Sequence, residues 1–416
     1  MTPAPHPLRY AWFVVALLVP VALLNYLDRQ MIAAMKASVM HDIPSIGSDT
    51  NWGFMLGQFK WVYAGLSPIG GYLADRFSRR FTIGASLFCW SAITYATGHV
   101  TTYDGLLWTR TLMGISEAFY IPAALALIAD YHTAGTRSRA VGAHQIGIYL
   151  GVITGSFAGY AADAPELGWR WMFNLTGVTG LVYALPLVWL LRDARGEADA
   201  GAPARAALTP GKAFAELFRN GSFILLVLYF TLPAIAGWVV RDWMPAILQK
   251  ELNLKQGLAG VSAVVYWQGA AIVAALAGGW LADRWMRRTP RGRIYVSAIG
   301  MACIVPAMLG VGMVVGLKSL PLAIAFLILF GIGWGFFDGN NMPILSQIVR
   351  PELRATGYGV MNLVSISCGG FADWGFGSLR DRNVPLNLIF GAFAGVALLS
   401  VFFVLLIKPR EGGAAG

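Results

Sequence analysis

GLLWTRTLMGISEAFYIPAALALIAD, from Gly105 to Asp130, is the stretch that decides the fold of this chain. It is mostly apolar and, at about 1.5 Å of rise per residue, long enough to cross a bilayer as a helix. It nevertheless contains Arg110 and Glu117. A charge near the bilayer centre costs at least about 2.5 to 3.5 kcal/mol, so this spacing of two helical turns predicts that both side chains face one another or a wet cavity. The alternatives are a pair that locks helices together and a proton or substrate site.

The second half of the chain repeats this pattern. A longer repeat accompanies it, because GGYLADRFSRR at 70–80 returns as GGWLADRWMRR at 278–288, about half of the 416 residues further on. Internal similarity at one large offset indicates a duplicated architecture, and we therefore expect two similar halves. The residues shared with the opening stretch are Gly114, Glu117 and Pro122 in the first half and Gly335, Asp338 and Pro343 in the second.

The composition indicates an integral membrane protein. Hydrophobic residues make up 57% of the chain, charged residues only 12%, and the mean hydropathy is +0.60. The net charge of +10 comes from arginines in short loops between apolar runs, which favours membrane orientation over nucleic-acid binding. Cys89, Cys303 and Cys368 lie in apolar segments without the spacing of a disulfide framework or a zinc site. We expect no metal and no cofactor.

The apolar runs predict an all-α membrane protein with twelve transmembrane helices in two pseudo-symmetric six-helix bundles. The first bundle covers 1–191, a cytoplasmic connector covers 192–218, and the second bundle covers 219–416. Within the connector, LTPGKAFAELF at 208–218 is expected to lie on the membrane surface as a short amphipathic helix. The expected spans are 10–35, 51–74, 81–99, 105–130, 138–163 and 170–191, then 222–249, 258–282, 291–316, 320–347, 355–378 and 385–407.

Arginines in the short loops predict the orientation. The loops after spans two, four, eight and ten are richer in arginine than the opposite loops, so they are expected on the cytoplasmic side together with both termini. The bacterial inner membrane is the expected location, and a monomer the expected state. These loop arginines are Arg76, Arg79, Arg80, Arg137, Arg139, Arg284, Arg287, Arg288, Arg291, Arg293, Arg350 and Arg354.

Two six-helix halves with the repeated LADR motif resemble the major facilitator superfamily over nearly the whole chain. Gly70, Gly71, Gly278 and Gly279 are expected to permit close helix contact. The resemblance implies that the motif gates the transporter by stabilising its outward-facing state; a purely topological role is the alternative. The gating residues would be Gly71, Asp75, Arg76, Arg79 and Arg80 in the first half and Asp283 and Arg284 in the second.

Within that superfamily, NYLDR at 25–29 together with Arg110 and Glu117 resembles the anion:cation symporters, which include sugar-acid carriers, sialin and the vesicular glutamate transporters. Fixed cations in a low-dielectric cavity attract a carboxylate, and acids there can carry a coupling proton. Asp28, Glu117 and Arg110 are therefore expected to couple the proton, and Arg29 to bind the substrate. Arg241, in VVRDWMP, resembles an arginine near the outer end of span seven in the glutamate transporters.

Several polar residues are expected to complete the substrate cavity. Amides suit the hydroxyl groups of a sugar-like substrate, although each is also suited to a hydrogen bond between helices. Lys60 is a further expected carboxylate contact, or a partner of Asp28 or Glu117. The amide candidates are Gln145, Asn341 and Asn362, and further polar candidates are His144 and Asp338.

The resulting hypothesis is a proton-coupled symporter of an organic anion, in the class of hexuronates, aldonates or sialic acid, that works by alternating access with protons and membrane lipid as its other partners. NYLDR and SEAFY at 116–120 also resemble spinster proteins, so a carrier of lysolipids is the main alternative. A receptor that signals without transport is a third class. No nucleophile and base set, phosphate loop or metal spacing indicates an enzyme.

Overall fold

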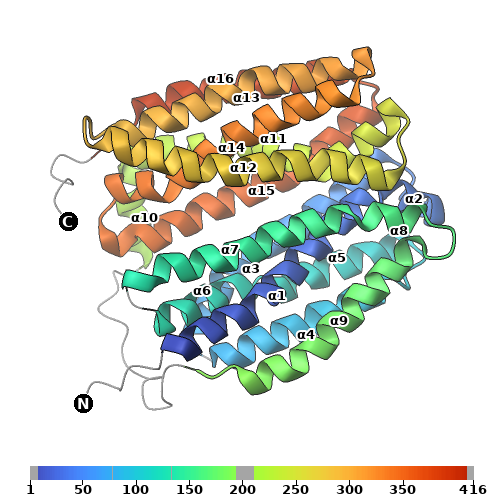
Figure 1. The fold of residues 1–416 in the computed structure, drawn as a ribbon, viewed down its shortest axis with the longest axis horizontal. Helices are drawn as coiled ribbons and strands as arrows, with labels where there is room; N and C mark the ends of the chain where they lie inside the picture. The colour runs from blue at the N-terminus through green and yellow to red at the C-terminus, as the bar shows by residue number, and fades with distance from the viewer. Residues whose placement is uncertain (1–7, 77, 133, 194–209, 410–416) are drawn as a thin grey trace. The chain divides into compact units, whose positions relative to one another are not determined.

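The computed structural model describes residues 8–76, 78–132, 134–193 and 210–409 (Figure 1). All regular secondary structure in these ranges is helical. A helix pairs its backbone N–H and C=O groups within one segment, which is what an apolar run needs where no water can satisfy them. The predicted all-α class with twelve spans is confirmed.

The first six spans are formed by single helices or by pairs of helices. A short helix and a 3-10 turn, α2 (Lys36–Asp42) and η1 (Pro44–Ile46), follow the first span. The spans are α1 (Leu8–Ala34), α3 (Asp49–Arg76), α4 (Arg79–Thr97), α5 (Tyr103–Glu117) with α6 (Tyr120–Tyr131), α7 (Ala134–Ser156) with α8 (Ala158–Asp163), and α9 (Gly168–Leu190).

The last six spans are single helices. Before them comes α10 (Pro210–Arg219), and a 3-10 turn, η3 (Pro351–Leu353), precedes the eleventh span. The spans are α11 (Gly221–Leu252), α12 (Gln256–Met286), α13 (Gly292–Leu317), α14 (Leu320–Ile348), α15 (Arg354–Asp381) and α16 (Leu386–Leu406).

Eight spans in the described ranges are long and apolar enough to cross a membrane on length and composition alone. The other four are α3, α4, α7 and α15, which have 28, 19, 23 and 28 residues and a more polar composition. Polar residues on a spanning helix must face protein or a wet cavity rather than lipid. We therefore expect the polar residues of these four helices to face the interior of the protein.

The fourth span is broken where one uninterrupted helix was expected. Its two parts meet at a turn formed by Ala118 and Phe119. Pro122, in the first turn of α6, has no N–H with which to bond the Ala118 carbonyl, and its ring crowds that carbonyl. The break therefore falls directly after Glu117, the last residue of α5.

Contacts between helices divide the chain into two compact units. Unit 1 comprises Met1–Gly47, Met55–Pro203 and Lys255–Gly260; unit 2 comprises Ser48–Phe54, Ala204–Leu254 and Val261–Gly416. In unit 1, α1 packs along α7 and α4 packs along α9, as Figure 1 shows. The division into bundles at 1–191 and 219–416 stays a prediction.

The core of unit 1 is built mainly from aliphatic side chains, many of them from α1 and α6, together with several aromatic rings. Trp90 and Tyr120 are buried there and meet edge to face with ring centroids 5.4 Å apart. In unit 2, α13 packs against both α14 and α16, while α11 packs against α15. These arrangements bring chain segments that are distant in sequence into each unit.

The connector helix α10 is amphipathic, as predicted for 208–218. Ala213 and Leu217, one turn apart, are buried, whereas Phe214 and Phe218, also one turn apart, are exposed. An exposed pair of aromatic rings on a short charged helix is typical of a helix that lies in the membrane interface.

Two helices have their first N–H groups bound by an aspartate from elsewhere in the same unit. In unit 1, Asp163 accepts hydrogen bonds from the backbone N–H groups of Gln256 and Gly257, at 3.1 and 2.7 Å. In unit 2, Asp381 accepts from the N–H groups of Asp49 and Thr50, at 3.0 and 2.8 Å. Each carboxylate satisfies donors that lack partners within the helix and opposes the positive end of its dipole.

Candidate functional site

Four charged side chains from two helices of unit 1 are withdrawn from solvent. Asp28 and Arg29 lie on α1, and Arg110 and Glu117 lie on α5. The exposed fractions are 2% for Asp28, 3% for Arg110 and 0% for Glu117, and the Arg29 side chain is 12% exposed. Such burial is tolerated when opposite charges compensate one another, and it is the usual mark of an ion or substrate pathway.

The closest pair in this cluster joins the two helices. Nε of Arg29 donates a 2.7 Å hydrogen bond to Oε2 of Glu117. The structure thus brings the residue expected to bind substrate against the residue expected to carry the proton. Arg110, seven residues before Glu117, is instead hydrogen-bonded from Nη2 to the hydroxyl of Thr97 at 3.2 Å, and its guanidinium lies 5.8 Å from the ring of Phe173.

Asp28 is held by a residue that the sequence did not single out. The hydroxyl of Thr94, on α4, donates to Oδ2 of Asp28 at 2.8 Å, and both groups are buried. Asp28 interacts electrostatically with both Glu117 and Arg110. The two acids and Arg110 therefore respond to one another, so a proton on one acid changes the field at the other.

Each of the four charged side chains has a buried polar atom without a hydrogen-bond partner among the described residues. The same is true of both amide atoms of Asn25, one turn before Arg29 on α1. Most buried polar atoms are paired, so several unpaired ones in one place indicate a site that binds something further. The atoms are Oδ1 of Asp28, Nη2 of Arg29, Nε of Arg110 and Oε1 of Glu117.

Aromatic rings surround the Arg29 guanidinium. Its central carbon lies 4.8 Å from the ring centroid of Tyr26, 4.9 Å from that of Phe59 and 4.5 Å from that of Tyr63. All three distances fall within the range of a cation–π contact. Lys60, the other cation predicted here, is buried on α3 beside Phe59; its pairing with Asp28 or Glu117 stays a prediction.

Near the break in the fourth span, α5 and the turn that follows it pack closely against α3. The carbonyl of Ala118 lies against Gly70 of α3, where a Cβ atom would come within 2.6 Å of the carbonyl oxygen. Gly114 approaches α3 in the same way, because a Cβ there would lie 2.9 Å from the Phe59 carbonyl oxygen. Two glycines thus let the helix that carries Glu117 approach the helix that carries Phe59 and Tyr63.

His144 and Gln145, both candidates on α7, have different surroundings. Nε2 of the buried His144 lies 2.8 Å from the hydroxyl of Tyr120, which lies 3.1 Å from the Leu18 carbonyl oxygen. This arrangement links three helices of unit 1 and is sufficient to explain a buried histidine. Gln145 is half-buried.

The candidates of unit 2 lie on three of its helices. Asn341, on α14, is buried, and both its amide atoms lack hydrogen-bond partners among the described residues. Asp338, on the same helix, is exposed, unlike its sequence counterpart Glu117. Arg241 on α11 lies 5.5 Å from the Trp238 ring, and Asn362 on α15 is half-buried. Their contribution to one cavity with the unit 1 residues stays a prediction.

Aromatic side chains line the part of α14 before Asp338. Trp334 lies 6.4 Å from Trp267 and 5.2 Å from Phe337 between ring centroids, and Phe337 stacks on Phe230 at 5.8 Å. Unit 2 thus contains a cluster of mostly buried aromatic rings. The sequence showed these rings without showing that they assemble.

The repeated LADR motif makes ion pairs at the helix ends. Arg79 pairs with Asp130 and donates to the Ala126 carbonyl at 2.8 Å, and Asp283 pairs with Arg293. The Arg80 backbone N–H donates to Asp193 at 3.0 Å, and the Arg284 guanidinium lies 5.8 Å from the Trp280 ring. The side chains of Asp75 and Arg76, and the surroundings of Gly71, lie outside what the structure describes.

The close helix contact predicted at the motif glycines holds at Gly70 and Gly278 and is wrong at Gly279. A Cβ at Gly278 would lie 2.9 Å from the Phe336 ring, whereas among the described residues nothing lies within 4 Å of one at Gly279. Consecutive helix residues differ by about 100° in direction, so the two glycines of such a pair do not both face the same neighbouring helix.

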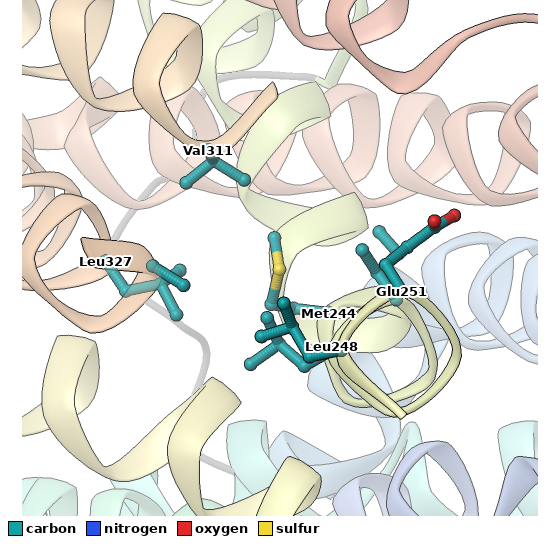
Figure 2. A pocket seen from close by; sticks show the side chains of 8 residues that line it. Met244, Leu248, Glu251, Val311 and Leu327 are labelled. Carbon is teal, nitrogen blue, oxygen red and sulfur yellow. The ribbon is translucent and has the colours of Figure 1, made fainter. Parts of the chain in front are cut away.

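A small apolar hollow lies inside unit 2, between α11, α13 and α14 (Figure 2). Met244, Leu248, Val311 and Leu327 point toward it, and the carboxylate of Glu251 points away from it in Figure 2. That carboxylate accepts a 2.9 Å hydrogen bond from Arg380. Lacking a polar group directed inward, the hollow is a packing space rather than the site of an anion.

Comparison with known sequences and structures identifies the fold. The sequence profile of the Major Facilitator Superfamily matches residues 18–372. A crystal structure of a bacterial homologue of the human lysosomal transporter Spinster, in an inward-facing and unoccupied conformation, matches with a TM-score of 0.76 and 21% identity over 98% of this chain and 95% of that one. At that identity the match concerns the fold alone.

Three related proteins share 27 to 29% of their residues with this chain. "Protein spinster" of Drosophila melanogaster is 28% identical over 87% of this chain, which spans only 60% of that protein's length. An "MFS-type efflux pump" of Mycolicibacterium smegmatis is 29% identical over 90% of this chain and 86% of its own. A "Probable L-galactonate transporter" of Escherichia coli K12 is 27% identical over 92% of this chain and 87% of its own.

Proposed function

Because this chain belongs to the Major Facilitator Superfamily, a family of membrane transporters and not of enzymes, we propose that it is a proton-coupled symporter of an organic anion, specifically a sugar acid. The observation that carries the proposal is the buried hydrogen bond between Arg29 and Glu117, with a polar atom of each side chain left without a hydrogen-bond partner among the described residues. A cation whose partner is a titratable acid can exchange that acid for the carboxylate of a substrate.

The proposed cycle uses the charges of unit 1. A proton from the outer side neutralises Glu117 or Asp28, and Arg29 then holds the substrate carboxylate through the N–H groups of Nη2 and the Nε–H that Glu117 releases. The change from the outward-open to the inward-open state carries the proton and the substrate to the other side of the membrane. There the proton and the substrate leave, and the bond between Arg29 and Glu117 re-forms. Arg110 keeps the two acids under a positive field throughout.

Two arguments support the proposed substrate class: the hydrogen-bonding groups of the candidate residues and the similarity to one related transporter. A carboxylate suits Arg29, and the amide groups of Gln145, Asn341 and Asn362 suit hydroxyl groups. The similarity to a probable L-galactonate transporter, covering most of both chains, supports a hexuronate, aldonate or sialic acid. Similarity to spinster favours a second candidate, a lysolipid carrier, in which Arg29 would hold the lipid phosphate.

We further propose that the protein is a monomer of the bacterial inner membrane with both termini on the cytoplasmic side. The arginines that follow α3, α6, α12 and α14 support this orientation, because cations concentrate in cytoplasmic loops. Cysteine labelling of an N-terminal residue from either side of sealed vesicles tests it; reaction from the periplasmic side would reverse it.

Uptake into proteoliposomes with an imposed pH gradient tests the function across a panel of sugar acids and lysolipids. We expect accumulation of a sugar acid that collapses when a protonophore dissipates the gradient. Glu117→Gln should abolish this accumulation while leaving counterflow exchange measurable. Glu251→Gln, which neutralises an ion-paired glutamate of unit 2, is the matched control and should accumulate normally. Accumulation of lysolipids alone, or undiminished accumulation by Glu117→Gln, contradicts the proposal.

A further inference from the structure

The Arg29 cage, defined as the rings of Tyr26, Phe59 and Tyr63, comes from two helices. Tyr26 and Arg29 are three residues apart on α1, and Phe59 and Tyr63 are four apart on α3, so each pair shares one helix face. The Phe59 and Tyr63 rings are stacked, with centroids 6.0 Å apart and planes inclined by 26°. Both are buried, as is the carboxylate that Arg29 contacts.

The cage and Glu117 contact the same guanidinium. A guanidinium donates hydrogen bonds from its edge and is attracted to aromatic rings through its face. Its Nε edge is bound to Glu117, and its Nη2 has no hydrogen-bond partner among the described residues. The N–H groups of Nη2 are therefore available to a carboxylate while the rings are in place.

Glu117 and the aromatic rings of the cage also respond differently to protonation. Protonation of Glu117 removes its negative charge, and a buried cation without compensation is costly. A phenylalanine ring has no titratable group and a tyrosine phenol ordinarily titrates only at about pH 10, so the attraction of the rings for Arg29 persists when Glu117 is neutral. A desolvated cation–π contact is stronger than an exposed one, and three such contacts act on this one group.

The geometry points to the Arg29 cage as the device that lets the bond between Arg29 and Glu117 open during transport. Tyr26, Phe59 and Tyr63 are positioning residues: they hold the buried guanidinium in place in the step in which Glu117 carries the proton. Arg29 thus stays directed at the incoming carboxylate instead of moving away with its lost partner. The inference rests on the proposed function for its place in the cycle, but the cage itself is testable without transport.

A double-mutant cycle on the purified full-length protein tests the cage independently of any substrate. Glu117→Gln imitates the protonated acid, so in that background Arg29 depends on the rings alone. We expect Phe59→Leu to lower the unfolding temperature at least twice as much in the Glu117→Gln background as in the wild-type background. Phe390→Leu, which removes a buried ring in unit 2, is the matched control and should have the same effect in both backgrounds. Equal effects of Phe59→Leu in both backgrounds would overturn the inference.

Uptake assays then distinguish the contribution of the Tyr63 ring from that of its hydroxyl group. Tyr63→Phe keeps the ring and should retain uptake within about twofold of the wild type, whereas Tyr63→Leu should lose about tenfold or more, with the remaining activity shifted to lower pH because Glu117 is harder to protonate. Equal loss in both variants, or an unshifted pH profile in Tyr63→Leu, contradicts the positioning role. If the wild type accumulates no substrate, the proposed function fails, while the double-mutant cycle still decides on the cage.

Discussion

The hydroxyl of Thr94 donates a 2.8 Å hydrogen bond to the carboxylate of Asp28, and neither side chain reaches solvent. This bond ties α4 to α1 at the charged cluster. It also lets a neutral residue influence the protonation of an acid, because a hydrogen bond to the ionised form stabilises the charge.

Thr94→Val should weaken the fold and alter the acid that Thr94 holds. Loss of a donor to a buried carboxylate costs about 1 to 3 kcal/mol, because the acceptor is left unsatisfied. We expect a lower unfolding temperature and proton-driven uptake that extends to higher pH, since Asp28 would be protonated more readily. Thr94→Ser keeps the donor and should resemble the wild type; a Val variant with unchanged stability and pH profile contradicts this role.

Gly70→Ala should be far more damaging than Gly279→Ala, although both residues belong to the repeated motif. A Cβ at Gly70 would meet the Ala118 carbonyl at 2.6 Å, and backbone cannot easily yield, so we expect a cost of about 1 to 3 kcal/mol. Open space surrounds a Cβ at Gly279 within 4 Å, and alanine there should be neutral or slightly stabilising. Unfolding temperatures of the two purified variants provide the measurement, and equal values would refute the difference.

Val311→Ile should stabilise unit 2 by filling the apolar hollow of Figure 2. One additional buried methylene contributes about 0.8 kcal/mol when space exists for it. Ala397→Val adds apolar volume at a fully buried position outside the residues that line the hollow, and it should destabilise by overpacking. Thermal unfolding of both variants checks the contrast, and a lower unfolding temperature for Val311→Ile would contradict it.

Asp163→Ala should destabilise the beginning of α12. The substitution removes the acceptor of the N–H groups of Gln256 and Gly257, and loss of a capping side chain costs about 0.5 to 2 kcal/mol. Asp163→Asn keeps an acceptor oxygen without the charge and should fall between alanine and the wild type. Hydrogen exchange of the first turn of α12 measures the effect; unchanged protection in Asp163→Ala would show that the cap is not needed.

The fold was largely predictable because the bilayer imposes a simple demand on sequence. Long apolar runs and the repeated motif were enough to predict twelve spans and two similar halves, and the superfamily match supports both. The interruption after Glu117 was not predicted. Pro122 was visible in the sequence, but proline is tolerated within spanning helices, and α14 contains Pro343 without a break.

The membership of the charged cluster was predictable, but its pairing was not. Helical spacing places Arg110 and Glu117 on one face of α5, yet it contains no information on how α1 is rotated against α5. The choice of Arg29 as the partner of Glu117 depends on that rotation. The role of Thr94 depends likewise on the packing of α4, and a threonine in an apolar span carries no distinctive signal.

The two repeats also show what spacing leaves undetermined. Glu117 and Asp338 occupy matching positions in the pattern, but the first is buried and the second exposed. Exposure is set by the helices that surround each residue, and duplication of a motif does not duplicate its surroundings. The same reasoning explains why Gly278 has a close neighbour and Gly279 has none.

The end of α5 at Glu117 has an electrostatic consequence. The last carbonyl groups of a helix together carry about half an elementary negative charge, and here they are placed at the middle of a span instead of at its aqueous end. The macrodipole of a helix fragment thus adds a permanent, pH-independent attraction for cations beside Arg29. A neutral residue in place of Arg29 would remove the cation that is hydrogen-bonded to Glu117 at this helix end.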